Sequence, residues 1–266
     1  MRPAACLTLS WDDGHPLDSR VAELMLRHNL RGTFYIPRAS EHSRMPIAQI
    51  RELSETFEVG AHTLRHVILT RVDDGRAWQE IYGSKRWLED ITGKPCPLFC
   101  PPSGRYAKRH LRMAERAGFQ GVRTVELLSL DWPRRTGALF SLPTSVQVWP
   151  HGARSYVQNA VRRGAFGNLW RYVVHGRPID WPALSHTLFS EALKRGGVFH
   201  LWAHSWEIED CGAWERLDNL MRFFAEHADQ AAALTNGEVC RMSLSRASRF
   251  VTEGTNSVSK PPAIPW

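Results

Sequence analysis

The sequence lacks the long apolar run that a membrane-spanning helix needs, since no stretch of about eighteen apolar residues occurs in it. It also lacks an apolar signal segment, because its first residues reach a polar cluster at Asp12 within a few positions. We therefore expect a cytoplasmic protein without a transmembrane segment. The chain has no block of like charge and no recognised nucleic-acid motif, so its net charge of +7 predicts no nucleic-acid partner. That charge indicates either an anionic substrate or an ordinary solvated surface.

Cysteine is scarce and irregularly spaced. The five cysteines make an odd count without the repeated spacing of a zinc finger, which favours reduced thiols. A disulfide between Cys96 and Cys100 is the alternative. With 266 residues, 43% of them hydrophobic, the chain is long enough to bury one large core, so a single domain is expected.

Strand and helix patterns alternate along the first half of the chain. Apolar runs typical of strands cover 5–11, 33–36, 57–60, 97–100 and 119–123, and helical periodicity covers 17–28, 47–55, 73–92 and 107–117. This alternation favours parallel strands wrapped by helices, in a barrel or a doubly wound sheet.

The middle of the chain is less regular. We interpret 127–182 as an insertion over one face of an α/β domain that spans residues 1–251. Beyond it, a helix over 184–195, a strand over 198–203 and a helix over 214–228 are predicted, followed by a strand and a short helix within 238–250. The proline-containing tail, 252–266, is expected to be extended or disordered.

Two adjacent carboxylates, Asp12 and Asp13, follow the first predicted strand. Two such charges are costly to leave together unless a cation or a proton separates them. A helix cap followed by a turn would explain the pair equally well.

Two histidines four residues apart follow the third predicted strand. His62 and His66 can share one face of a helical turn and bind one metal, although such a pair is often incidental by itself. With Asp13 they supply two imidazoles and one carboxylate, a ligand set suited to a divalent transition metal that must also hold water. Asp12 then lies beside the metal, as a base for that water.

A third element is the buried strand that leads to His204. Alternate strand residues share a face, so His200, Trp202 and His204 point the same way, and His204 can reach the same cavity. Amide hydrolysis needs an acid opposite its base, because an amine leaves only when protonated. His15 and His200 are expected to have structural roles, and His151 is expected to be a surface loop residue.

These residues resemble the motifs of the polysaccharide deacetylase superfamily (carbohydrate esterase family 4, NodB homology). The run SWDDG from Ser10 to Gly14 is similar to its motif T-F-D-D-G, and HTLRH from His62 to His66 matches H-S/T-x-x-H. Trp202-Ala203-His204 resembles its motif L-x-H, with Trp in place of Leu. The resemblance covers about 5–123 and 197–207, and it implies a distorted (β/α) barrel of seven or eight parallel strands.

The resemblance also implies a role for each matching residue. Asp12 is the expected base and His204 the expected acid. The expected metal ligands are Asp13, His62 and His66. The metal is a divalent cation, zinc first, with Co²⁺, Ni²⁺ or Fe²⁺ as alternatives.

The chain departs from the family at its third motif, R-x-P-aromatic-G. The aligned run CPPSG, from Cys100 to Gly104, lacks both the arginine that holds the base and the aromatic residue. Arg105 or Arg123 would have to replace that arginine, while the loop can still offer a backbone N–H to an oxyanion. The candidate substrate-binding residues are therefore Pro102, Ser103, Gly104, Arg123 and Trp202. A fourth motif has only a weak counterpart, at Asp131-Trp132.

The function expected from this pattern is removal of an acetyl group from an amino sugar by a metal-dependent hydrolase. With no export signal, the expected substrate is an intracellular glycan precursor or a small glycoconjugate. Two alternatives remain. One is a related C–N hydrolase, a deformylase or cyclic amide hydrolase. The other is an inactive homologue that binds glycans, marked by its damaged third motif.

Overall fold

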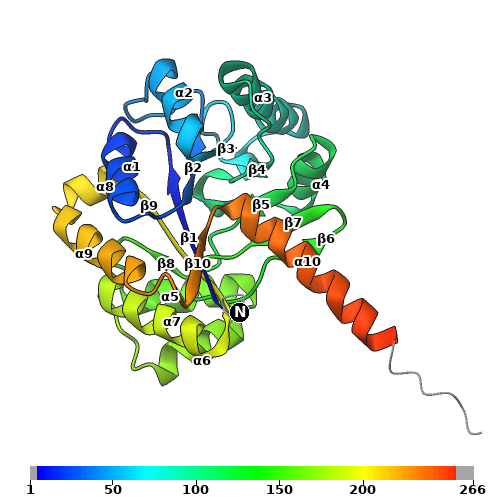
Figure 1. Cartoon of the computed structure of the whole chain (residues 1–266). Coiled ribbons are helices and arrows are strands. Elements are labelled where there is room, and N and C mark those ends of the chain that lie inside the picture. Colours follow the sequence, from blue (N-terminus) through cyan, green and yellow to red (C-terminus); the bar gives the residue numbers. More distant parts are fainter. Residues whose placement is uncertain (1–4, 256–266) are drawn as a thin grey trace, which may run out of the picture.

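The computed structural model describes residues 5–255, with their side chains as far as residue 245 (Figure 1). The strands of this part are β1 (Ala5–Asp12), β2 (Gly32–Ile36), β3 (Glu58–Ala61), β4 (Leu98–Phe99), β5 (Gly121–Arg123), β6 (Arg134–Thr136), β7 (Leu139–Leu142), β8 (Val146–Gln147), β9 (Gly197–His204) and β10 (Ala231–Leu234). The helices are α1 (Asp18–Arg27), α2 (Ile47–Thr56), α3 (Asp74–Thr92), α4 (Lys108–Arg116), α5 (Ala153–Arg163), α6 (Phe166–Val174), α7 (Trp181–Arg195), α8 (Ser205–Asp210), α9 (Trp214–Ala225) and α10 (Asn236–Thr255).

One sheet contains all of these strands, in the order β6-β7-β5-β4-β3-β2-β1-β9-β8, with β10 also paired to β1. Every pairing is parallel except that of β6 with β7. Strands β7 and β8 lie far apart in that order but are separated in the chain by only three residues, 143–145, so the two ends of the sheet meet. The sheet is thus curled into a distorted barrel with eight strands in its parallel path, as the sequence predicted.

The interior of the barrel determines which residues form the central strands. All eight residues of β1 are buried, because β1 is paired along both edges and covered on both faces. This burial explains its nearly continuous apolar sequence, which is typical of parallel strands. Helix α3 packs outside, and its ends are set locally. Asp73 accepts a hydrogen bond from the backbone N–H of Arg76, and Gly93 takes the left-handed conformation with φ 68°.

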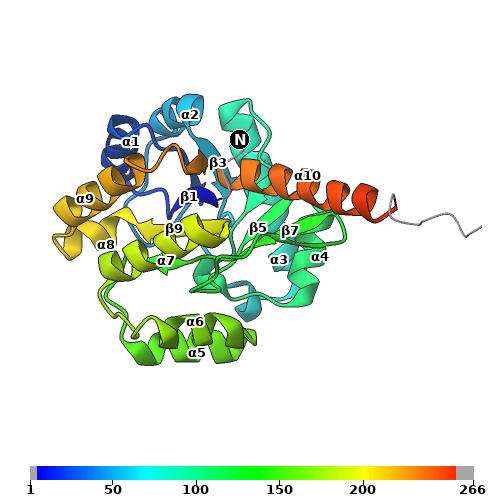
Figure 2. The same cartoon turned by 60° about the horizontal axis from the view of Figure 1, so that its bottom comes forward.

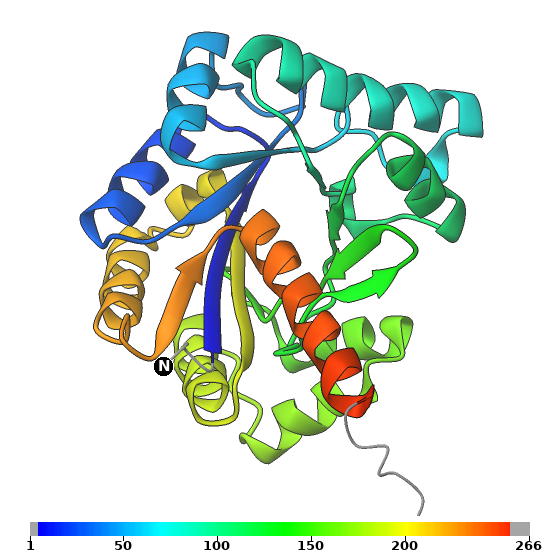
Figure 3. The ribbon, with the colours of Figure 1, turned by 45° about the vertical axis from the view of Figure 1, so that its right-hand side comes forward.

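Helix α10 packs against the barrel. Figure 3 shows α10 running beside β10, β1 and β9. Its first turns bury Val239 against Cys6 and Val198, and Cys240 against Leu98 and other residues inside the barrel. Helix α10 continues to Thr255, so the prediction that 252–255 is extended is wrong. The predicted strand within 238–250 is also wrong, because the last strand is β10. Residues 256–266 of the predicted tail lie outside the described residues.

The predicted insertion is smaller than expected. Residues 134–147 supply β6, β7 and β8 to the sheet, and only the paired helices α5 and α6 stand outside the ring of helices (Figure 2). Strand β7 pairs with β5 and strand β8 pairs with β9, and these pairings outweigh the weak apolar periodicity of β7 and β8. None of the described helices is long and apolar enough to cross a membrane. All five cysteines lie in the described part and none is disulfide-bonded.

Candidate active site

Three side chains converge where β1 and β3 end. Asp13 follows β1, and His62 and His66 follow β3, so parallel pairing brings them to the same edge of the sheet. Asp13 Oδ1 lies 3.1 Å from His66 Nε2 and 3.6 Å from His62 Nε2. One ligand atom from each residue falls within 4.8 Å of the others. Asp13 Oδ1 is buried and has no hydrogen-bond partner among the described residues.

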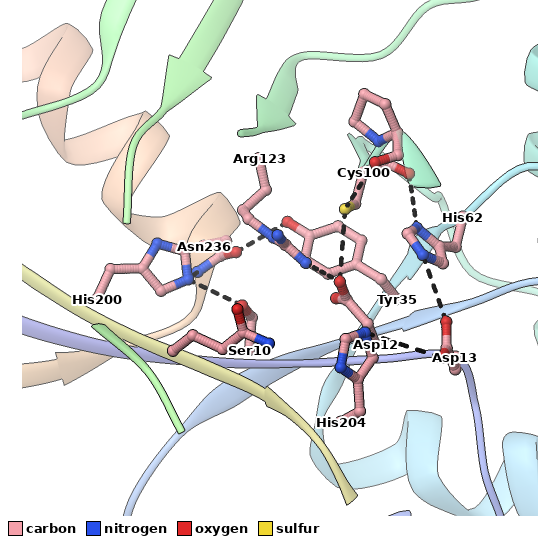
Figure 4. Close-up of polar contacts among 12 residues, drawn as sticks. Ser10, Asp12, Asp13, Tyr35, His62, Cys100, Arg123, His200, His204 and Asn236 are labelled. Atoms are coloured by element: carbon pink, nitrogen blue, oxygen red, sulfur yellow. Dashed lines mark hydrogen bonds and ion pairs between the residues drawn. The ribbon is translucent and has the colours of Figure 1, made fainter. Parts of the chain in front are cut away.

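The remaining contacts of these residues prepare them for a cation. The carbonyl oxygen of Cys100 lies 2.7 Å from His62 Nδ1 and can only accept a hydrogen bond. His62 therefore carries its proton on Nδ1, which leaves the lone pair of Nε2 facing Asp13 (Figure 4). Burial lowers the pKa of His62 to about 4, so the ring is neutral, as a metal ligand must be. Asp13 Oδ2 accepts a hydrogen bond from Trp206 Nε1, which leaves Oδ1 directed at the two rings.

The backbone supports this geometry at some cost. Asp13 and His66 have φ values of 80° and 53°, a left-handed region that non-glycine residues rarely adopt. Such residues persist only where the surrounding structure holds them, and they gather at functional sites. The three side chains thus fit a divalent cation in their donor atoms, their tautomer and their convergence.

Asp12 lies beside this group and is held by an arginine. Arg123, on β5, donates a hydrogen bond from Nη2 to Asp12 Oδ2, and both side chains are buried. The guanidinium carbon lies 4.6 Å from the centre of the Trp202 ring and 5.4 Å from that of Tyr35. Burial raises the pKa of Asp12, but the charge of Arg123, its hydrogen bond and the charge of His204 outweigh burial and lower the pKa. Asp12 is therefore an ionised carboxylate.

His204 lies at the end of β9 and is the register partner of Asp12 on the neighbouring strand β1. Its Nδ1 lies 2.8 Å from Glu207 Oε2, and its Nε2 lies 3.8 Å from Asp13 Oδ2. Burial lowers the pKa of His204, but the contact with Glu207 and the charge of Asp13 outweigh it and raise the pKa to about 9. Glu207 also accepts a hydrogen bond from Gln147, whose Oε1 lies 2.8 Å from His151 Nε2.

A cavity of about 990 Å³ opens over these groups. Asp12, Asp13, both metal-ligand candidates on the β3 loop and His204 lie at one part of its lining. Ser103, Gly104 and Trp202 also line it, as expected for substrate-binding residues. Pro102 is buried and is not in the lining, although Pro101 is. Arg123 was a candidate substrate-binding residue, but it is completely buried and holds Asp12 instead.

Arg105 and Arg123 were the two candidates to replace the arginine that the third motif lacks, and Arg123 contacts Asp12. Arg123 takes the place of the missing arginine, and Arg105 lies exposed in the cavity lining. Asp131 pairs with Arg134 on the surface, and neither Asp131 nor Trp132 lines the cavity.

Three residues of the site were missed by the sequence reasoning. Glu207 and Trp206 follow His204 on α8, and a carboxylate three residues after a histidine is a spacing that allows contact. Gln147 on β8 had no such signal, because its strand lies within the segment interpreted as an insertion. His151 contacts this group and lines the cavity, so it is more than a surface loop residue.

Comparison with known proteins gives a family. Residues 2–122 match the family model for polysaccharide deacetylase, a segment that contains Asp12, Asp13, His62 and His66. A Bacillus cereus peptidoglycan-N-acetylglucosamine deacetylase is 26% identical over 118 residues, which cover 44% of this chain and 54% of that protein. The chain therefore spans about half the length of this curated relative.

Two solved structures show the same fold. A Mycobacterium smegmatis protein provisionally named a polysaccharide deacetylase superposes with a TM-score of 0.66, at 13% identity, over 100% of this chain and 96% of that one. A CE4 family pseudoenzyme from Bacillus anthracis gives a TM-score of 0.52 at 12% identity, over 88% of this chain and 65% of that one. The fold alone thus does not decide activity. The segment 2–122, with the motifs of β1 and β3, thus matches polysaccharide deacetylase, and together with the fold this supports the NodB-homology superfamily.

Proposed function

We propose that the protein is a metal-dependent N-deacetylase that removes an acetyl group from an amino sugar. The observation that carries this proposal is the convergence of Asp13 Oδ1, His62 Nε2 and His66 Nε2, with Asp12 and His204 beside them as register partners on neighbouring strands. A divalent cation bound by the first three would polarise the substrate carbonyl and lower the pKa of water. Two imidazoles and a carboxylate suit zinc first, with Co²⁺, Ni²⁺ or Fe²⁺ as alternatives.

The residues of this chain then divide the proton transfers between them. Asp12 is ionised and accepts a proton from the water that attacks the acyl carbon. Arg123 is a positioning residue, because its hydrogen bond fixes the carboxylate while Oδ1 remains without a partner. His204 is protonated through its contact with Glu207 and donates that proton to the departing nitrogen. Ser103 and Gly104 line the cavity, but the Gly104 N–H donates to the carbonyl of Pro101, so the backbone N–H of Ser103 is the one that would support the oxyanion.

The cavity favours a substrate that carries an anionic group. Four arginines line it: Arg71, Arg105, Arg162 and Arg163. Among the described residues, the carboxylates in the lining are Asp12, Asp13 and Glu207, which belong to the reacting centre. Arg163 is oriented by hydrogen bonds to the carbonyl of Gly104 and the hydroxyl of Tyr106. Guanidinium groups bind phosphates and carboxylates strongly, so we propose a phosphorylated or carboxylated acyl-amino sugar.

We also propose that this substrate is intracellular and that the protein acts in the cytoplasm. The support is the absence of a disulfide among the five cysteines, since thiols stay reduced in that compartment. The curated relative acts on peptidoglycan by its name, so an extracellular polymer is the competing substrate.

A panel assay tests the proposal. Zinc-loaded and cobalt-loaded protein is incubated with N-acetylated and N-formylated amino sugars, each with and without phosphate, and acetate and formate are measured. Acetate release supports the proposal. Release of formate alone would make the protein a deformylase, and sugar binding without turnover would make it an inactive homologue.

Metal analysis provides an independent test. His62→Ala and His66→Ala should each lose bound metal, whereas His42→Ala, a change elsewhere in the cavity lining, should retain it. Unchanged metal content in the first two variants would contradict the ligand assignment.

A further inference from the structure

The helices α5 and α6 expose an unusual amount of apolar surface. Of eleven large hydrophobic residues that are exposed in the described part of the chain, seven lie between residues 157 and 179. On α6 they recur at positions i, i+4, i+7 and i+8, which places them on one face of the helix: Phe166, Trp170, Val173 and Val174. Phe166 is 64% exposed and Trp170 is 69% exposed. A contiguous face of this kind marks an interaction surface.

The same helices are firmly packed on their other side. Asn168 and Tyr172 are the buried residues of α6, and Tyr156 and Ala160 are those of α5. The rings of Tyr156 and Tyr172 lie 4.9 Å apart, so the two helices contact each other through their inner faces. The outward apolar face is therefore held in place by a buried one. Figure 2 shows the pair at the periphery of the molecule.

The charge of this segment is entirely of one sign. Residues 153–179 contain five arginines and no aspartate or glutamate. Arg154 and Arg177 are exposed and form no ion pair with any described carboxylate, whereas Arg162 lines the cavity. Arg171 is different, since it pairs with Glu191. An apolar helical face that contains Trp and Phe and is flanked by unpaired arginines is typical of a helix that lies in a membrane interface.

We propose that α5 and α6 dock on an anionic lipid surface, with Phe166 and Trp170 inserted at the level of the headgroups and the free arginines against lipid phosphates. Charge complementarity favours this partner over a second copy of the chain, because a symmetric contact through this face would bring arginines together. Helix α5 also lines the cavity through Gln158 and Asn159, so docking holds the cavity beside the lipid surface. The docking does not depend on the proposed hydrolysis.

Vesicle co-sedimentation tests the proposal with the full chain. The protein should sediment with vesicles of phosphatidylcholine and phosphatidylglycerol in equal parts, and far less with phosphatidylcholine alone or in high salt. The paired change Phe166→Ser and Trp170→Ser should weaken binding by about tenfold or more. The matched control, Leu26→Ser with Ile47→Ser, removes two exposed apolar residues of α1 and α2 and should bind as the unmodified protein does.

Arginine variants test the electrostatic contribution to vesicle binding separately from the apolar contribution. Arg154→Gln with Arg177→Gln should weaken binding to the anionic vesicles by about fivefold for each arginine, whereas Arg222→Gln on α9 should not. Equal loss in test and control variants, or no binding to anionic vesicles, would overturn the proposal. So would a dimer, seen by sedimentation velocity without lipid, that dissociates on Trp170→Ser. Acetate release from a soluble substrate should be unchanged in the Phe166 and Trp170 variant, which separates this proposal from that of the reaction.

Discussion

Replacing Arg123 with methionine removes the cation that is hydrogen-bonded to Asp12. Methionine preserves much of the volume of the side chain between the rings of Tyr35 and Trp202, so the change mainly deletes charge. Asp12 is left with its burial, which raises the pKa, and without the hydrogen bond to its Oδ2. The carboxylate must then take up a proton or remain as an unpaired buried charge.

The expected loss follows from the burial of both partners. Their side chains are 0% and 4% exposed. Removing one member of a buried pair typically costs about 3–5 kcal/mol of unfolding free energy. The exposed pair of Arg216 and Asp180, with side chains 50% and 53% exposed, gives a matched control. Arg216→Met should cost below about 1 kcal/mol, since solvent screens such a pair.

Urea denaturation of chelator-treated protein measures both changes, and a double-mutant cycle assigns the cause. Arg123→Met combined with Asp12→Asn should cost less than the sum of the single changes by at least about 1 kcal/mol, because the double variant leaves neither member of this pair as an unpaired buried charge. Additive losses would refute the reasoning. Cys100→Arg should partly rescue Arg123→Met, since Cys100 Sγ already lies 3.8 Å from Asp12 Oδ2.

Four other changes have defined outcomes. Burial lowers the pKa of His200 to about 3, so between pH 6.5 and about 3 the unfolded chain binds one more proton than the folded one. As the pH is lowered through that window, the free energy of unfolding decreases by about 1.4 kcal/mol per pH unit. Urea titrations of His200→Gln should lack this contribution. Gly104→Ala should lower the thermal midpoint, because a Cβ there would lie 2.1 Å from Val125 Cγ2 at a φ of +59°, and Val125→Ala should recover part of the loss. Asp12→Asn and His204→Gln should each reduce kcat by about 10²–10⁴-fold with smaller changes in KM, and in steady-state assays the double variant should fall short of the product of the two losses. Chelation should abolish turnover yet leave the far-UV circular dichroism spectrum intact, because the apolar core rather than the metal holds a chain of this size together.

The first half of the fold could be predicted because each strand and helix there has a clear local pattern of apolar residues. The predicted strand over 33–36 and helix over 73–92 differ from the observed β2 and α3 by one residue at their starts. The middle could not be predicted in this way. Strands β6, β7 and β8 are only two to four residues long. The hairpin of β6 and β7 joins the sheet through β5, and β8 through β9, which is distant in the sequence.

The residues of the candidate site also divide into those with a local sequence pattern and those that depend on distant strand pairing. The spacing of His62 and His66 and the adjacency of Asp12 and Asp13 are local patterns, and the structure brings their side chains to one cavity. The support for His204 is less local. Glu207 follows it by one helical turn, but Gln147 reaches Glu207 only because β8 pairs with β9.

Arg123 explains why an altered motif need not mean an altered site. The requirement imposed by Asp12 is for a cation in contact with Oδ2, and it does not specify which strand supplies that cation. Strand β4 lies beside β5, so a side chain at the end of either strand can reach the same carboxylate. The small thiol of Cys100 contacts the same oxygen as Arg123, so an arginine at both positions would place two guanidinium groups on one acceptor. The residues at positions 100 and 123 are therefore coupled, because a small residue after β4 leaves room for the arginine at the end of β5.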